Sequence, residues 1–456
     1  MTVDIEHWSR RLAVLADKHG VPGATLAILK DGEVADTAYG VLNLRTGVST
    51  TTDSLFQIGS ITKVWTATLV MQLVDDGLLD LDAPLTTYLP SFRVADPDVT
   101  QHVTTRHLLA HTSGIDGDLF LDTGRGDDCI ERYVDACATL GQNHPLGATM
   151  SYCNSGYTIL GRLIEVLRGA TWDDVLRERL LAPLGATTAG TLPEEALLHS
   201  AAVGHITPPG KDITVAPRWG IFRSAGPAGL IHATARDVLA FARLHLNDGT
   251  TPDGAHVLSP QSAQGMREPQ VAVPDTYTLG SHWGLGWILM NWSGHDIYGH
   301  DGNTIGQSAY LRIIPDKGVA VCLLTNGGHA HDLFVDLFNE VLGDLADVQM
   351  PQRLEPPTDK PHVDLDAYVG RYARQSFEIT FAAAGDHLVG QPQSTGELAA
   401  AISTEPLPPY RVYPIEDGVF AGRNEDGASW TPFVFFTLDD GARYLHMGAR
   451  ATPKVD

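Results

Sequence analysis

The sequence predicts an α/β domain, in which helices flank an antiparallel sheet beside an α-rich lobe, followed by a small all-β domain. Three observations predict this architecture: a strand pair near each end of the first 350 residues, helical periodicity next to each pair, and a Pro-rich stretch that precedes short alternating strands. A length of 456 residues also exceeds that of one ordinary compact domain. We expect the first domain at residues 1–350, a linker at 351–361 and the second domain at 362–456.

The first elements are a helix and a hairpin. Residues 4–19 repeat apolar side chains at helical spacing, and a glycine and a proline follow to end the pattern. Residues 24–29 and 34–39 then flank Asp31-Gly32, a strong turn signal between two antiparallel strands. The sequence therefore predicts that one helix precedes the first strand pair.

The rest of the first domain is predicted to be an α-rich region and a second hairpin. Helical spacing returns at residues 61–74, and residues 82–240 mix helical stretches with loops. Residues 308–314 and 319–325 are apolar strands around a Pro-Asp-Lys-Gly turn, and a helix is predicted at 333–345. An early and a late helix would thus bracket a sheet whose strands come from both ends of the domain.

Composition marks the linker and the second domain. Four prolines fall within eleven residues, namely Pro351, Pro356, Pro357 and Pro361. Beyond them, stretches such as 377–381 and 433–436 alternate or cluster apolar residues between Gly and Asp turns. This pattern predicts a small all-β barrel or sandwich.

Charge and cysteine content exclude several classes of protein. Lys and Arg number 31 against 55 Asp and Glu, a formal net charge of −24, which argues against nucleic-acid and anionic membrane partners. The cysteines have neither zinc-site nor disulfide-framework spacing, and they are Cys129, Cys137, Cys153 and Cys322. The N-terminus is acidic where a secretory signal is basic, and no apolar run is long enough for a membrane span. We therefore expect a cytoplasmic protein without a membrane partner, metal or cofactor.

The first candidate for chemistry is the pair Ser60 and Lys63. If a helix begins at Ser60, positions i and i+3 share one face and bring the amine to the hydroxyl. A neutral lysine can accept the serine proton if burial or a nearby cation lowers its pKa from about 10.4. The alternative is an ordinary helix start with a surface lysine.

The second candidate is Tyr152-Cys153-Asn154, which lies directly before a predicted helix. A phenol can relay a proton, and an amide two residues later can orient a substrate carbonyl or hold a lysine. The alternative is a buried tyrosine followed by an N-cap asparagine. We interpret Cys153 as a wall residue of the same site.

The third candidate is a His-x-Gly motif, which occurs three times, at His282/Gly284, His300/Gly302 and His446/Gly448. His300 precedes the second strand pair, where a sheet-edge histidine could face a cleft and Gly302 would allow a close backbone approach. His282 lies in an aromatic run that indicates packing, and His446 falls in the second domain. We therefore favour His300.

In chain order, these three elements resemble the signature of the penicillin-recognising serine enzymes, and in particular the class C β-lactamase-like branch. That branch includes D-aminopeptidases, esterases of the β-lactamase fold and penicillin-binding-protein-type thioesterases. Other phrases across residues 5–345 support the resemblance, and they are Phe56-Gln57-Ile58-Gly59-Ser60, Leu108-Leu109-Ala110-His111-Thr112-Ser113-Gly114, Pro227-Ala228-Gly229-Leu230 and Trp283-Gly284-Leu285-Gly286-Trp287.

The resemblance implies a β-lactamase/transpeptidase-like fold, with the active site in a cleft between sheet and α-rich lobe, and an acyl-enzyme mechanism. Ser60 would attack a carbonyl, and Lys63 and Tyr152 would share its proton. Asn154 would orient the acyl donor, and His300 would help to bind the substrate or protonate the leaving group.

The resemblance also implies an oxyanion hole, made by the backbone N–H groups of Ser60 and Asn303. Where classical β-lactamases and transpeptidases carry Lys-Thr-Gly, this sequence has His300-Asp301-Gly302. A cation that would pair with a penicillin or D-Ala carboxylate is thus replaced by a mostly neutral imidazole, which disfavours β-lactam hydrolysis. Asp301 would suit an amine-bearing substrate or, alternatively, cap a turn.

Two further sets of histidines are given structural interpretations. His111 is expected to be a loop residue, and His329 with His331 lacks carboxylate partners at metal-site spacing.

The second domain resembles the lipocalin-like module that some class C-like enzymes carry. We expect it to cover the cleft and restrict which acyl groups enter.

The function predicted from these features is serine-dependent acyl transfer from an ester, thioester or peptide to water or an amine. A small-molecule or peptide substrate is expected, including a thioester-linked or carrier-protein-bound peptide. One alternative is a stand-alone penicillin-binding-protein-type thioesterase that releases or macrocyclises a nonribosomal peptide. A second is a non-catalytic β-lactam- or peptide-binding protein of the same fold.

Overall fold

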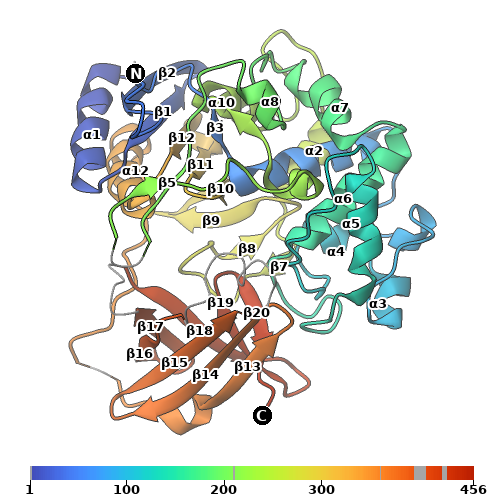
Figure 1. Ribbon diagram of the computed structural model, residues 1–456, viewed down its shortest axis with the longest axis vertical. Helices are drawn as coiled ribbons and strands as arrows, with labels where there is room; N and C mark the ends of the chain where they lie inside the picture. The colour runs from blue at the N-terminus through green and yellow to red at the C-terminus, as the bar shows by residue number, and fades with distance from the viewer. Residues whose placement is uncertain (1–2, 209–210, 360, 395–406, 424–428) are drawn as a thin grey trace.

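The computed structural model describes residues 3–208, 211–359, 361–394, 407–423 and 429–456. Two antiparallel sheets dominate it, and Figure 1 shows them in separate parts of the molecule. The first sheet, with its helices, occupies one end, and the second sheet lies at the other end with the C-terminus. Both predicted strand systems are therefore present.

The first sheet joins the two predicted hairpins. Its strand order is β2-β1-β12-β11-β10-β9-β8-β7, and every neighbouring pair is antiparallel. Ala27 of β1 pairs with Asp36 of β2 on one side and with Cys322 of β12 on the other. The strands are β1 Gly23–Lys30, β2 Glu33–Gly40, β7 Val271–Ala272, β8 His282–Trp283, β9 Ile288–Trp292, β10 His295–Asn303, β11 Ser308–Ile314 and β12 Val319–Thr325.

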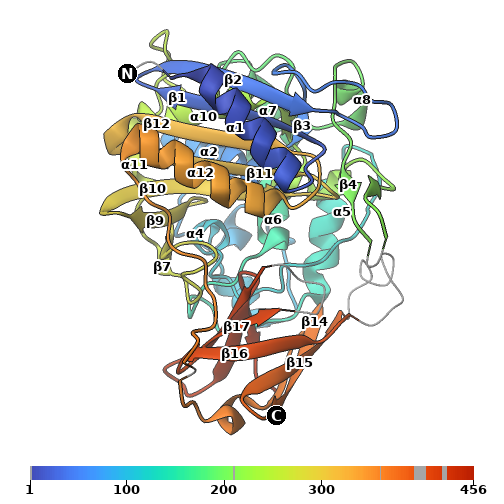
Figure 2. The ribbon, with the colours of Figure 1, turned by 90° about the vertical axis from the view of Figure 1, so that its left-hand side faces the viewer.

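Two helices cover one face of this sheet. They are α1 (Ile5–Lys18) and α12 (Ala330–Ala346), which lie side by side in Figure 2. Asp4 begins α1 by accepting a hydrogen bond from the His7 N–H. Arg11 pairs with Glu340 across the two helices. The prediction that an early and a late helix bracket the sheet is confirmed.

The α-rich lobe is built around one central helix, α2 (Thr62–Asp75), which is buried on every face over its first three turns. Trp65 of α2 stacks on Phe241, with ring centroids 4.1 Å apart. The other α-helices of the first domain are α3 Pro97–His102, α4 Thr105–Leu109, α5 Cys129–Ala136, α6 Asn154–Arg168, α7 Trp172–Leu176, α8 Pro193–Ala196, α9 Gly226–Gly229, α10 Ala235–Leu246, which packs on β1 and β12 of the sheet, and α11 Pro260–Gly265. Short strand pairs add β3 Phe56–Gln57 with β6 His232–Ala233, and β4 His205–Ile206 with β5 Thr214–Val215.

The C-terminal domain is a single sheet that curls into a near-barrel. Each strand pairs with the next in the chain, and the Val455 N–H donates to the carbonyl oxygen of Arg371 (2.9 Å), which brings the last strand to the first. Aromatic side chains such as Phe381 and Phe433 fill its core. This is consistent with the predicted lipocalin-like module. The strands are β13 Gly370–Arg374, β14 Phe377–Ala384, β15 His387–Ser394, β16 Tyr410–Glu416, β17 Val419–Arg423, β18 Thr431–Thr437, β19 Arg443–Met447 and β20 Arg450–Pro453.

Within the described ranges, no helix combines the length and the apolar character that crossing a bilayer requires.

Candidate active site

The candidate nucleophile, Ser60, lies in a tight turn directly before α2. Gly59 has φ +51°, and a Cβ there would lie 2.6 Å from the Asn303 nitrogen. A Cβ on Gly302 would lie 1.9 Å from the carbonyl oxygen of Ile58. Strand β10 therefore packs backbone to backbone against the nucleophile turn, and this explains why the predicted His-x-Gly motif ends in glycine.

Lys63 lies one helical turn after Ser60, as the spacing predicted. Its Nζ is 3.1 Å from Ser60 Oγ and 2.6 Å from the carbonyl oxygen of Ala228, and the side chain is completely buried. No carboxylate of the described chain lies within ion-pair distance of Nζ. Burial, with the Arg450 guanidinium nearby, holds the pKa of Lys63 well below its usual range. The amine is thus suited to accept a proton.

Tyr152 lies over the lysine, with Lys63 Nζ 4.8 Å from the ring centroid. Burial raises the pKa of the phenol, an effect that the adjacent Ser60 hydroxyl partly offsets. Tyr152 Oη makes no hydrogen bond of normal geometry to any residue the structure describes. The phenol is therefore protonated at neutral pH and can pass a proton between Ser60 and a substrate atom.

His111 lies in a turn, as expected for a loop residue, but its contact with Tyr152 was not predicted. The two ring centroids are 4.4 Å apart. His111 accepts the backbone N–H of Cys153 at Nδ1 (3.0 Å) and the N–H of Ser151 at its carbonyl oxygen (2.9 Å). Burial lowers the pKa of His111 well below its usual value, so the ring is neutral. Its position in the Leu108–Gly114 phrase was the available signal.

Asn154 lines the cavity, but it neither holds Lys63 nor caps the helix. Asn154 is the first residue of α6, and its Nδ2 donates to Asp118 Oδ1 (3.2 Å) rather than holding Lys63. The N-cap is Cys153, whose Sγ accepts from the N–H of Gly156 (3.2 Å). Cys153 is not a wall residue of the site, because its side chain is buried as a helix cap, and burial raises its pKa to about 12.

His300 lies on β10 at the site, and its environment fixes its tautomer. Nδ1 is 2.6 Å from the carbonyl oxygen of Asp301, which can only accept, so Nδ1 carries the proton. Burial, with Lys63 nearby, lowers the pKa of His300 to about 3. At neutral pH Nε2 therefore has no proton to give, and His300 is suited to accept a hydrogen bond rather than to protonate a leaving group.

Asp301 lies within β10 and does not cap a turn, which corrects one of its two interpretations. Its carboxylate is held by the fork of Arg312, with Oδ2 3.1 Å from Nη2 and Oδ1 bound to Nη1. The positive charge of Arg312 offsets the negative charge of Asp301, which an amine-bearing substrate would need.

Asn303 lines the cavity at Ser60. Its side-chain Oδ1 accepts a hydrogen bond from Ser308 Oγ (2.8 Å). Ser60 and Asn303 both line the same cavity, so their N–H groups remain the predicted oxyanion hole.

The cavity at Ser60 has a volume of about 390 Å³ and is largely apolar. Its apolar and aromatic walls are Leu119, Phe120, Tyr133, Ile221, Leu279, Trp283 and Ile288. Trp283 contacts both Tyr152 and His300 edge to face, with centroids 5.7 and 5.5 Å apart. Sequence analysis assigned this aromatic run to packing, and the structure places Trp283 on the cavity wall.

The C-terminal domain closes part of this cavity with the turn between β19 and β20. Gly448, Ala449 and Arg450 line it. The Tyr152 N–H donates to the carbonyl oxygen of Ala449 (2.8 Å), and the Ala451 N–H donates to Ser151 Oγ (3.1 Å). The guanidinium of Arg450 lies 5.1 Å from the centroid of the Tyr152 ring. No motif in the sequence indicated Arg450.

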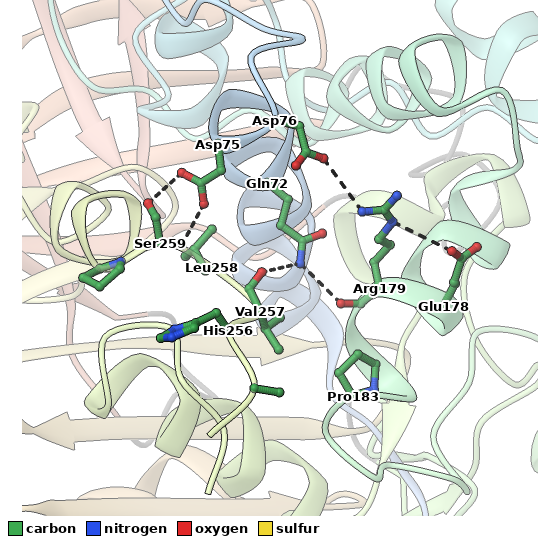
Figure 3. Close-up of a pocket in the computed structure, with 12 residues that line it drawn as sticks. Gln72, Asp75, Asp76, Glu178, Arg179, Pro183, His256, Val257, Leu258 and Ser259 are labelled. Atoms are coloured by element: carbon green, nitrogen blue, oxygen red, sulfur yellow. Dashed lines mark hydrogen bonds and ion pairs between the residues drawn. The ribbon is translucent and has the colours of Figure 1, made fainter. Parts of the chain in front are cut away.

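A larger hollow of about 610 Å³ lies elsewhere, at the far end of α2 (Figure 3). Its residues include Gln72, Asp75 and Asp76, and none of them lines the cavity at Ser60. The carboxylates there are already paired, Asp75 with Ser259 and Asp76 with Arg179. Ser259 in this hollow is the N-cap of α11, and its hydroxyl donates to Asp75 Oδ1 (2.7 Å).

Comparisons with known proteins agree with this geometry. The family model described as Beta-lactamase matches residues 8–343. Penicillin-binding protein 4 of Amycolatopsis lactamdurans is 51% identical over 377 residues, which cover 82% of this chain and 99% of that protein.

Solved structures are similar over the same region or beyond it. SurE has a TM-score of 0.80 at 30% identity over 99% of both chains, and SurE with D-Leu has 0.77 at 29%. A D-amino acid amidase from Ochrobactrum anthropi SV3, complexed with L-phenylalanine, has 0.61 at 25% identity over 75% of this chain and 99% of that one. Because the family match spans the sheet, the lobe and the Ser60–Lys63 pair, the chain belongs to the beta-lactamase family of serine hydrolases.

Proposed function

We propose that the protein is a serine acyl-enzyme hydrolase or acyltransferase, which takes an acyl group from an ester, thioester or peptide and hands it to water or an amine. The observation that carries this proposal is the 3.1 Å separation between Ser60 Oγ and Lys63 Nζ, with the amine buried and its pKa lowered. A hydroxyl beside a neutral amine is an activated nucleophile.

The reaction would have two steps, acylation of Ser60 and then deacylation. Lys63 takes the proton of Ser60 as Oγ bonds to the carbonyl carbon, and the carbonyl electrons move to the oxygen. Collapse re-forms the carbonyl and breaks the bond to the leaving group, which takes the proton from Lys63 directly or through Tyr152. Water or an amine then attacks the acyl-enzyme in the same way and frees Ser60. His300 Nε2 would accept a hydrogen bond from the substrate.

Arg450 favours a narrower proposal, in which a substrate presents a free carboxylate near the reacting carbonyl. The family's usual cation is absent at His300, while Arg450 brings one to the same cavity from the C-terminal domain. Its Nε and Nη2 bind Asp118 and its Nη1 binds the carbonyl oxygen of Gly448, so these three contacts leave two of its five N–H groups. A carboxylate fits that edge.

Peptidyl transfer is the form of this activity that we favour. A free carboxylate belongs to the end of an amino acid or peptide, and the names of two structural relatives mention D-Leu and a D-amino acid amidase. In a stand-alone penicillin-binding-protein-type thioesterase, which releases or macrocyclises a nonribosomal peptide, the C-terminal carboxyl of the substrate is tied up in the thioester, so Arg450 would bind the carboxylate of the released linear peptide.

The test of the general proposal is turnover of a small panel: a chromogenic ester, a D-amino-acid anilide, a cephalosporin and a peptidyl thioester. We expect the ester and the peptidyl thioester to be turned over by the unmodified protein and not by Ser60→Ala. Binding without turnover of any member would instead support the non-catalytic alternative.

The narrower proposal is tested with paired substrates that end in a carboxylate or in the matching amide. At a pH above the acidic limb of both proteins, where Lys63 is neutral in each, Arg450→Gln should lower kcat/KM for the carboxylate member roughly 10- to 100-fold more than for the amide member, because a charge-assisted hydrogen bond is lost. Arg450→Lys is the matched control for charge without the fork. Equal losses on both substrates would contradict carboxylate recognition.

A further inference from the structure

One carboxylate, that of Asp118, links the C-terminal domain to the catalytic centre. Asp118 Oδ1 accepts from Arg450 Nη2 (2.7 Å) and from Asn154 Nδ2 (3.2 Å). Oδ2 accepts from Arg450 Nε (3.1 Å) and lies 2.9 Å from Arg374 Nη1. Burial alone would raise the pKa of Asp118, but the Arg450 and Arg374 guanidinium groups hold it at about 2. The group is therefore ionised throughout the physiological range.

The residues around Asp118 come from three separate parts of the fold. Arg374 ends β13 and Arg450 begins β20, both in the C-terminal domain, whereas Asn154 begins α6 of the lobe. The turn after β13 makes a second contact beside this one, because Ser376 Oγ donates to Asp116 (3.2 Å). Two hairpins of the C-terminal domain thus dock on residues 116–118.

We propose that Asp118 is a positioning residue that couples the docked C-terminal domain to the catalytic centre, by fixing Arg450 and the Asn154 amide relative to each other. Asp118 is not among the residues that line the cavity, while Arg450 and Asn154 both line it. The role that we assign to it rests on the acyl-enzyme function proposed above.

The contact with Asp118 also sets the orientation of the Asn154 amide. An ionised carboxylate only accepts, so Nδ2 of Asn154 must face Asp118. The carbonyl oxygen Oδ1 is then turned away from Asp118 and is left to accept an N–H of a peptide-like acyl donor. Loss of the carboxylate would free the amide to rotate and would release Arg450 from its place.

The pair also acts on Lys63 through its charges. Arg450 lowers and Asp118 raises the pKa of Lys63. Removing one or the other should therefore move the titration of Lys63 in opposite directions, which a loss of packing would not do. The ionisable and polar groups that face Lys63 are Ser60, His111, Tyr152, Cys153, Tyr157, His300, Asp118 and Arg450.

The experiment measures, in the full chain, the pH dependence of Ser60 labelling by a fluorophosphonate, together with hydrogen exchange of the Tyr152 and Ala451 amides. Asp118→Asn should slow labelling roughly 10- to 100-fold at neutral pH because Asn154 and Arg450 are misplaced. The acidic limb of the pH profile follows the titration of Lys63. Asp118→Asn should move this limb to lower pH because the pKa of Lys63 falls, whereas Arg450→Gln should move it to higher pH because that pKa rises. Exchange of both amides should rise roughly tenfold in Asp118→Asn.

The control variant is Gln375→Ala, which removes the hydrogen bond that the Gly141 N–H donates across the same domain interface and leaves the side chains of Asp118, Asn154 and Arg450 unaltered. We expect it to leave the labelling profile unchanged. If Asp118→Asn does not fold, Arg374→Gln loosens the same carboxylate from the C-terminal side and should raise exchange of both amides.

Two results would overturn the role of Asp118. The first is that Asp118→Asn shows the same labelling rate and the same amide exchange as Gln375→Ala. The second is that the acidic limb of the labelling profile moves in the same direction in Asp118→Asn and in Arg450→Gln. If the unmodified protein is not labelled at Ser60, the acyl-enzyme proposal fails instead. The exchange comparison then still decides whether Asp118 holds the two segments together.

Discussion

Lys63 is the residue on which the chemistry depends, because a completely buried lysine without a carboxylate partner is costly unless it is neutral. Its Nζ satisfies two hydrogen bonds, one to the candidate nucleophile Ser60 and one to the carbonyl oxygen of Ala228. The same burial that disfavours the ammonium makes the amine a base at neutral pH. The burial of Lys63 thus accounts for both the position and the protonation state of its amine.

Replacing Lys63 by arginine tests this argument at the residue scale. Arginine places a permanent cation where the lysine amine is neutral, and it does not lose its proton in a protein, so it cannot act as the base. We expect Lys63→Arg to slow acylation of Ser60 by roughly 10² to 10⁴-fold, which stopped-flow assay with a chromogenic ester would measure. Acylation within a factor of about three of the unmodified rate would refute general-base action by Lys63.

Helix spacing identified the local pair Ser60 and Lys63, and the family resemblance added the distant residues Tyr152, Asn154 and His300, but neither indicated Arg450 or Asp118. Ser60 and Lys63 are one helical turn apart, so their contact follows from helix geometry alone. Arg450 and Asp118 are 332 positions apart in the chain, and only domain docking brings them together. Asn154 was identified, but its partner Asp118 was not.

At the scale of elements, strand β10 positions the site by packing against the nucleophile turn. A Cβ on Gly302 would lie 2.9 Å from the Ser60 nitrogen as well as against Ile58. The predicted hairpins, the helices that bracket the sheet and α2 all formed as expected, because each has its own periodicity or turn signal. The docking of β10 on the turn has no such signal beyond a single glycine.

Gly302→Ala should therefore damage both stability and activity. The methyl group would push β10 away from the turn, and we expect a loss of about 1–3 kcal/mol in the free energy of unfolding together with slower acylation of Ser60. Chemical denaturation and the chromogenic assay measure the two effects.

Gly265→Ala is the matched control, because a Cβ at Gly265 of α11 would meet no atom within 4 Å. If Gly302→Ala behaved like Gly265→Ala in both measurements, the close approach of β10 to the nucleophile turn would be wrong.

At the scale of the whole molecule, several histidines are buried in neutral form. His245 is completely buried, with Nε2 3.0 Å from Thr68 Oγ, and burial lowers its pKa to about 3. Burial also lowers the pKa of His300 to about 3 and the pKa of His232 to about 4. The unfolded chain binds these protons near the ordinary histidine pKa of about 6.5.

Stability should therefore fall as the pH decreases from about 6.5 towards 4, because the unfolded state binds more protons than the folded state across this window. Each such histidine contributes a slope of up to about 1.4 kcal/mol per pH unit. Urea unfolding at several pH values measures the total slope, and His245→Gln should reduce it by about one histidine's share. An unchanged slope in that variant would contradict a neutral His245.

The two-domain arrangement was predicted from composition, and its consequence for the site was predicted only in outline. A lipocalin-like module that covers the cleft was expected, and the structure places the Gly448–Arg450 turn on the cavity wall. Which residues of the module reach the site depends on the register of β19 and β20 and on docking between domains, and neither has a local signal.

Ser60 is tested as the nucleophile by the mass of the intact protein after brief exposure to a peptidyl thioester, followed by peptide mapping of any adduct. We predict one acyl group, attached to the peptide that contains Ser60 and absent from Ser60→Ala. An adduct that persists in Ser60→Ala, or one that maps to another residue, would contradict the assignment of Ser60 as the nucleophile.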